Sequence, residues 1–121
     1  MRPDPSPERW QLLADDAPGA TLLIPADVRR ERRFEIGCAI TVQRPAAASA
    51  EAAPTWHEMT VLANGVKQWS GRVPTQNPGT YDGLDYRFAR TVPVGQALRV
   101  SVAVTGQGVR RRSLVIEADE I

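Results

Sequence analysis

The chain has 121 residues, a formal net charge of +1 and a single cysteine. This length suits one domain with its own core, the small net charge gives no general attraction to nucleic acid or anionic membranes, and one cysteine excludes an intramolecular disulfide. No apolar run approaches the roughly 20 residues that span a bilayer, and no signal peptide is visible, so we expect a cytoplasmic protein. Arginine far outnumbers lysine, and Ala and Pro are abundant, as is typical of a GC-rich bacterial genome.

The first 19 residues are rich in proline and predict an irregular N-terminal arm. Trp10 is expected to pack this arm onto the rest of the molecule. A short apolar run over 20–24, ended by Pro25, is consistent with a first or edge strand. The sequence therefore predicts an arm over residues 1–19 and a β-sandwich domain over residues 20–121.

Residues 33–43 have the pattern of a strong strand. Successive side chains of a strand point to opposite faces, so apolar residues of one parity share a face. Here they are Phe34, Ile36, Cys38, Ile40 and Val42. On this face Cys38 is expected to be a buried, unreactive thiol. The Ala-rich segment 45–54 lies between two prolines and predicts a mobile loop.

Asn64 and Gly65 predict a two-residue type I′ hairpin turn, because both tolerate the positive φ that its central positions need. The strands on either side lie within residues 55–73. The register of such a hairpin pairs Ala63 with Val66, Val61 with Gln68, and Thr60 with Trp69.

This register decides which face of the hairpin meets the core. Met59, Val61, Ala63 and Val66 would share one face, which carries no charge near the turn. We interpret that face as the core side, which leaves Trp56 and Trp69 on the outer face with Lys67. The opposite assignment, with both tryptophans in the core, is nearly as well supported.

Three further strands are predicted near 84–92, 97–105 and 109–118, after a turn-rich loop over 74–83. Residues 106–108, Gly-Gln-Gly, are expected to join the last two strands as a hairpin. About seven strands and no convincing helix predict an all-β fold, a single antiparallel β-sandwich that is immunoglobulin-like or a related Greek key. A partly open barrel is the alternative.

Patterns that would carry catalysis or metal binding are weak. His57 is the only histidine, and we expect it at the surface or near the rim of the core. One His and one Cys cannot build a structural zinc site, and Asp82 and Asp85 match no calcium-loop spacing. The sequence therefore predicts no enzyme activity, no metal and no cofactor.

Arginines cluster over 29–33 and over 110–112. Such clusters can hold phosphates or nucleic acid. Strand alternation divides each run between two faces, however, and neither is interleaved with the aromatic residues that single-strand binders use. We expect solvated turns and strand ends, with no nucleic-acid partner and no membrane contact.

The aromatic residues are the remaining candidates for a binding role, because an exposed aromatic patch often meets a partner protein or a ligand. The predicted function is a non-catalytic binding or accessory module that meets another protein or a second copy of itself. Its candidate binding residues are Trp56, Trp69, Tyr81 and Lys67. The alternative is a sandwich that binds a small ligand or carbohydrate through Trp69 and Tyr81. A third hypothesis is a subunit of an enzyme whose chemistry lies on another chain.

Overall fold

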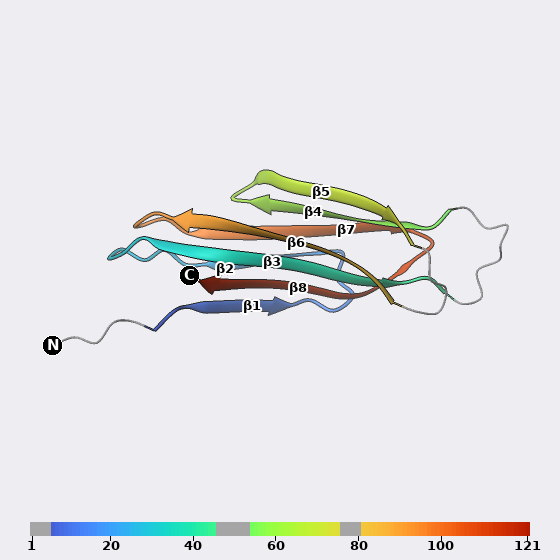
Figure 1. Ribbon diagram of the computed structural model, residues 1–121, viewed down its shortest axis with the longest axis horizontal. Helices are drawn as coiled ribbons and strands as arrows, with labels where there is room; N and C mark the ends of the chain where they lie inside the picture. Colours follow the sequence, from blue (N-terminus) through green and yellow to red (C-terminus); the bar gives the residue numbers. More distant parts are fainter. Residues whose placement is uncertain (1–5, 46–53, 76–80) are drawn as a thin grey trace.

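The computed structural model describes residues 6–45, 54–75 and 81–121, which contain eight strands and no helix (Figure 1). The strands are β1 Arg9–Leu13, β2 Gly19–Ile24, β3 Arg32–Gln43, β4 Trp56–Ala63, β5 Val66–Pro74, β6 Tyr81–Val92, β7 Leu98–Gln107 and β8 Arg110–Glu120. Apart from its two ends, the mobile loop predicted over 45–54 lies outside the described residues.

The strands form two antiparallel sheets of four, in the orders β1-β8-β3-β6 and β2-β7-β4-β5. Each strand of the first half pairs with one of the second half: β1 with β8, β2 with β7, β3 with β6, and β4 with β5. A long hairpin folded over in this way is the eight-stranded jelly roll, which consists of two Greek keys. The predicted all-β antiparallel sandwich is confirmed, and its strand order is the Greek-key alternative.

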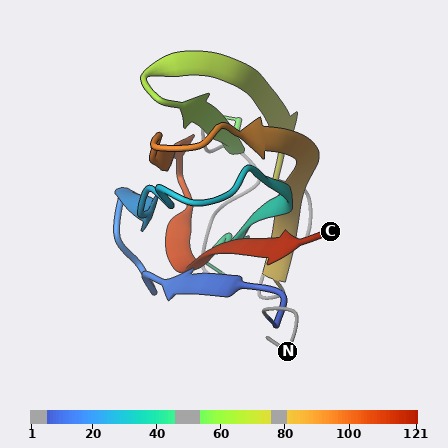
Figure 2. The ribbon, with the colours of Figure 1, turned by 90° about the vertical axis from the view of Figure 1, so that its left-hand side faces the viewer.

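The two sheets form two layers that face each other (Figure 2). The core lies between them, where the alternating apolar side chains of both inner faces meet. The predicted inner face of β3 is confirmed, since Phe34, Ile36, Cys38, Ile40 and Val42 are all buried. In β8 the residues that alternation groups on one face, Leu114, Ile116 and Ala118, are likewise buried. Period-two alternation thus located the core side chains of the long strands.

The segment around β1 corrects the predicted irregular arm. Residues 9–13 form an edge strand, with Trp10 opposite Ala118 and Leu12 opposite Ile116 in β8. Trp10 does pack against the core, as expected. The apolar pattern is too short to identify a strand by itself, and the strand that stabilises it lies at the other end of the chain.

The connection between the last two strands is also different from the prediction. β7 belongs to one sheet and β8 to the other, so residues 106–108 do not close a hairpin. Gly106 and Gln107 still pair with β4, and residues 108 and 109 cross between the two layers. Gly108 has a φ of +68°, which favours glycine. A glycine-rich turn looks the same in sequence whether the strands that it joins are paired or lie in different layers.

An ion-pair cluster joins the beginning of the described chain to its end, and it corrects, for Arg30 and Arg32, the expectation that the first arginine run is solvated. Arg32 is only 3% exposed. Its guanidinium donates to Glu8 Oε1 at 2.8 Å and to the Pro25 carbonyl at 2.7 Å. Arg30 donates to Glu8 Oε2 at 2.8 Å and to Glu120 Oε1 at 3.0 Å. These carboxylates compensate for the burial of charge.

Stability should depend on the charge of Glu120 at acid pH. Hydrogen bonding to Arg30 holds the pKa of this carboxyl below its usual value. The unfolded chain therefore takes up the proton first, so the stabilisation is complete above the unfolded-state pKa and is lost as pH falls through the folded-state pKa. We expect Glu120→Gln to flatten the dependence of unfolding free energy on pH below about pH 5, measured by urea denaturation.

Asp119→Asn is the matched control, because the neighbouring carboxylate forms only an exposed ion pair with Arg9 at 3.2 Å. This variant should keep the acid dependence of the unmodified chain. Equal slopes for the unmodified chain and Glu120→Gln would show that the cluster does not contribute to acid stability.

Candidate functional site

The β4–β5 hairpin turns at Asn64 and Gly65, whose φ values of +49° and +80° confirm the type I′ turn. Ala63 lies opposite Val66, as predicted. The register then shifts between Val61 and Leu62, so that Val61 faces Trp69. The extra residue on β5 is Gln68, which makes a β-bulge.

The bulge overturns the predicted outward position of Trp69. A shift of one residue moves every later side chain of β5 to the other face. Trp69 therefore lies on the inner face, half-buried and packed against the core, beside the buried Met59 and Val61. Trp56 belongs to the opposite face of the hairpin, as predicted. The pattern of residue types around the turn does not reveal the bulge.

Trp69 takes part in a row of three stacked rings, here called the aromatic row: Trp69, Tyr86 and Phe88. The ring centroids of Trp69 and Tyr86 are 4.8 Å apart at an interplanar angle of 7°. Those of Tyr86 and Phe88 are 5.7 Å apart at 26°. Gly71 makes room for the first ring, since a Cβ there would lie 2.4 Å from Cη2 of Trp69. The row links β5 of one sheet to β6 of the other, along the side of the sandwich where these two edge strands lie.

The four predicted binding residues do not form one site. Trp56 lies under the Arg72 guanidinium, which is 3.7 Å from its ring centroid. Lys67 is exposed beside the turn at the other end of the same hairpin. Tyr81 begins β6 and is 58% exposed, with the Arg112 guanidinium 5.6 Å from its ring. Only Trp69 belongs to the aromatic row, and Tyr86 and Phe88 are not among the predicted binding residues.

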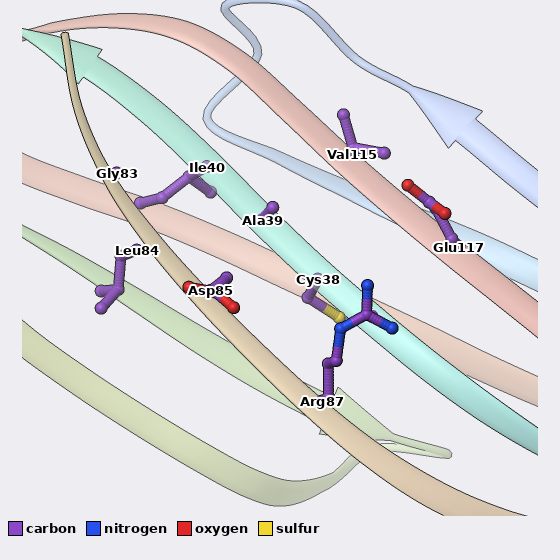
Figure 3. Close-up of a pocket in the computed structure, with 10 residues that line it drawn as sticks. Cys38, Ala39, Ile40, Gly83, Leu84, Asp85, Arg87, Val115 and Glu117 are labelled. Carbon is purple, nitrogen blue, oxygen red and sulfur yellow. The ribbon is translucent and has the colours of Figure 1, made fainter.

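A depression of about 360 Å³ lies on the outer face of the first sheet, next to β6 (Figure 3). The depression forms because Gly37, Ala39 and Gly83 carry little or no side chain. Asp85 and Arg87 line it from β6, and the Arg87 side chain extends over β3 close to Gly37. The small residues that form this depression could be recognised in the sequence, because Gly37 and Ala39 share the outward parity of their strand.

β6 itself is an unusually regular edge strand. All 12 of its residues pair with β3 without a shift, from Tyr81 opposite Gln43 to Val92 opposite Arg32. It contains no proline, and along its other edge no strand pairs with it within the described part of the chain. β5, the neighbouring edge, carries the bulge, a lysine and a terminal proline, which oppose further strand pairing.

His57 is buried, at 1% exposure, which corrects its predicted place at the surface or core rim. Its Nδ1 lies 2.6 Å from Thr75 Oγ1, and its Nε2 lies 3.2 Å from the Gly83 carbonyl oxygen. The imidazole therefore joins β4 to the segments that end β5 and begin β6. It shares the parity of the buried Met59 and Val61 and lies with them on the core face of β4.

The Cys38 thiol is 1% exposed, and burial raises its pKa to about 12. Because the thiolate is the reactive species, we expect Cys38 to react slowly with a thiol reagent at pH 8 in the folded protein and rapidly in denaturant. Absorbance of a released thiolate chromophore measures both rates. Rapid labelling of the folded protein would contradict the burial and reopen a nucleophilic role.

The second arginine run is tied to backbone and aromatic partners in its later residues. Arg111 Nε donates to the Asp16 carbonyl at 2.8 Å, and Arg112 contacts Tyr81.

No group of three or more His, Cys, Asp or Glu side chains that could hold a metal occurs among residues 6–45, 54–75 and 81–121. The same residues include no helix long and apolar enough to cross a membrane.

Comparison with other proteins gives a likeness of fold only. No protein-family model matches the chain, and no curated protein matches it. Among solved structures, dimeric latent PorU from Porphyromonas gingivalis is similar over 94% of this chain, with 16% identity and a TM-score of 0.46. The chain spans only 13% of that protein's length, and nothing about function follows from the likeness.

Proposed function

We propose that this domain is a non-catalytic protein-interaction module that binds its partner through edge strand β6. The observation that carries the proposal is the contrast between the two edges on this side of the sandwich. β5 has features that oppose strand pairing, whereas β6 is long, regular and without proline. Natural proteins commonly protect such an edge unless another strand covers it.

The edge position of β6 determines what kind of partner the domain can bind. An unpaired edge offers a row of N–H and C=O groups, to which an extended segment can add as the next strand. The main chain supplies affinity, and alternate side chains supply specificity. The half-buried Tyr86 and Phe88 rings lie along this strand, and aromatic rings contribute strongly to the energy of protein interfaces.

The carbohydrate alternative has less support from the ring geometry. Sugar stacking needs an open aromatic face. Trp69 is stacked on Tyr86 and lies against Gly71, Trp56 lies under Arg72, and an arginine also approaches the Tyr81 ring. No specific observation supports the hypothesis that the chain is a subunit of an enzyme. The cytoplasm stays the predicted compartment, on the grounds of the sequence alone.

Site-specific photocrosslinking tests the proposal. A photoreactive amino acid replaces Ala89, an exposed residue of β6, in cells that make the full chain. The control replaces Leu23, which is 50% exposed on β2, an edge strand of the other sheet. We expect a covalent protein adduct from position 89 and none, or far less, from position 23. No adduct at position 89, or equal yields at both positions, would contradict the proposal.

A further inference from the structure

The sequence of β6 is self-complementary about Tyr86. At equal distances on either side, residues of matching character occur: Asp85 and Arg87, Leu84 and Phe88, Gly83 and Ala89, Asp82 and Arg90. An acid thus corresponds to a base twice, a large apolar residue to another, and a small residue to another. This symmetry has an obvious use only if the strand pairs with a copy of itself.

We infer that β6 pairs antiparallel with β6 of a second copy of this chain, about a two-fold axis at Tyr86. The inference rests on the proposed function and names the partner. A two-fold interface uses the same patch on both subunits, so the patch must be complementary to itself. The pairing joins the two β1-β8-β3-β6 sheets into one continuous sheet across the dimer and covers the edge of β6.

The outer-face charges fit this arrangement. Asp85 of each copy lies opposite Arg87 of the other, and the two-fold axis repeats the pair. The Asp85 side chain is exposed, and within the described residues it has no ion pair or hydrogen bond. Arg87 contacts Glu35 at 3.2 Å but remains 65% exposed. Its guanidinium therefore retains donors for a carboxylate of the second copy.

The charges also select the register. Sliding the copies so that the axis falls at Asp85 would place this carboxylate opposite itself, and an axis at Arg87 would do the same with two guanidinium groups. Like charges directly opposite each other destabilise a strand pair. In the register centred on Tyr86, unlike charges meet on both faces, because Asp82 then lies opposite Arg90. Specificity of this kind depends on repulsion in the wrong registers as much as on attraction in the right one.

The side chains of the inner face extend the aromatic row. Leu84, Tyr86 and Phe88 are half-buried in the single chain and pack against its core. In the dimer Tyr86 lies beside its symmetry mate, and Leu84 lies beside Phe88 of the second copy. On the outer face Gly83 lies opposite Ala89, and these small residues let the two strands approach closely. The partly exposed rings of both chains thereby become more buried in the dimer.

Two charge-reversed variants test the pairing by sedimentation velocity on the full chain. The unmodified chain is expected to form a dimer. Asp85→Arg leaves only bases at positions 85 and 87, and Arg87→Asp leaves only acids. Each variant alone should dimerise at least about tenfold more weakly, because like charges then face each other. An equimolar mixture of the two should recover the dimer, since opposite charges face each other again.

Glu117→Arg is the control, because it makes the same charge change on the same sheet face but in β8, two strands away from β6. It should leave the dimer unchanged. Circular dichroism and thermal melting check that each variant is folded, and the neutral variants Asp85→Asn and Arg87→Gln serve if a reversal prevents folding. These should weaken the dimer less than the reversals do.

Three results would overturn the inference: a monomer at about 100 µM, a concentration at which even weak strand-edge dimers with micromolar Kd form; single variants that dimerise as the unmodified chain does; or a mixture no better than its components. A photocrosslink from position 89 to a different protein would leave the proposed function standing while this inference fails. No crosslink at position 89 combined with a monomer would remove both.

Discussion

Replacing Ile36 by aspartate is expected to leave the domain unfolded at 25 °C. Ile36 has no exposed surface and lies in β3, between β8 and β6. The change removes about 1.5–3 kcal/mol of apolar burial. It also places a carboxylate without a partner among apolar side chains, which costs several kcal/mol more whether the group ionises or stays protonated. A domain of this size is stable by roughly 5–15 kcal/mol, so little or nothing remains.

Thr41→Asp in the same strand is the matched control. Thr41 lies on the outer face, opposite Gly83 and Ser113, where its side chain is partly accessible. This variant should fold, with a loss of about 1 kcal/mol or less. Far-ultraviolet circular dichroism and urea denaturation measure both. Equal damage from the two substitutions would mean that the faces of β3 are assigned the wrong way round.

Trp69→Ala is expected to lower the free energy of unfolding by about 3 kcal/mol, near the lower end of the range for large aromatic residues because Trp69 is half-buried. The loss comes from its contacts with the core and from the stack on Tyr86. Trp56→Ala is the control from the same hairpin. Its ring lies on the outer face under Arg72, so its removal should cost about 1 kcal/mol.

Denaturation in urea measures the two losses, and Trp69→Phe adds a second check. Phenylalanine keeps a ring against Tyr86 and should recover more than half of the loss caused by alanine, because most of the buried area and the stack return. Similar losses from Trp69→Ala and Trp56→Ala would contradict the inward position of Trp69. They would favour the register without a bulge, in which both rings lie outside.

The strands and most of their faces could be predicted because they depend on local sequence. Period-two alternation in β3 and β8 follows from the geometry of any strand with one face in a core. The Asn64-Gly65 turn follows from the φ angles that these two residues tolerate. The same parity rule also places His57 and Arg32 on core faces. Both are polar residues whose burial depends on partners from other segments, namely Thr75 and Gly83 for His57, and Glu8 and Pro25 for Arg32.

By itself the sequence determined the fold class, the inner face of the long strands, the hairpin turn and the self-complementary order of residues in β6. Only the tertiary structure decided that β1 is a strand, that residues 108 and 109 cross between sheets, that Gln68 makes a bulge, and that β6 lies at an edge. The physical reason is that these features depend on pairing between segments far apart in the chain. A hydrogen-bonded neighbour leaves no mark in the alternation of a single strand, so the pairing of β1 and the edge position of β6 appear only when the sheets are assembled.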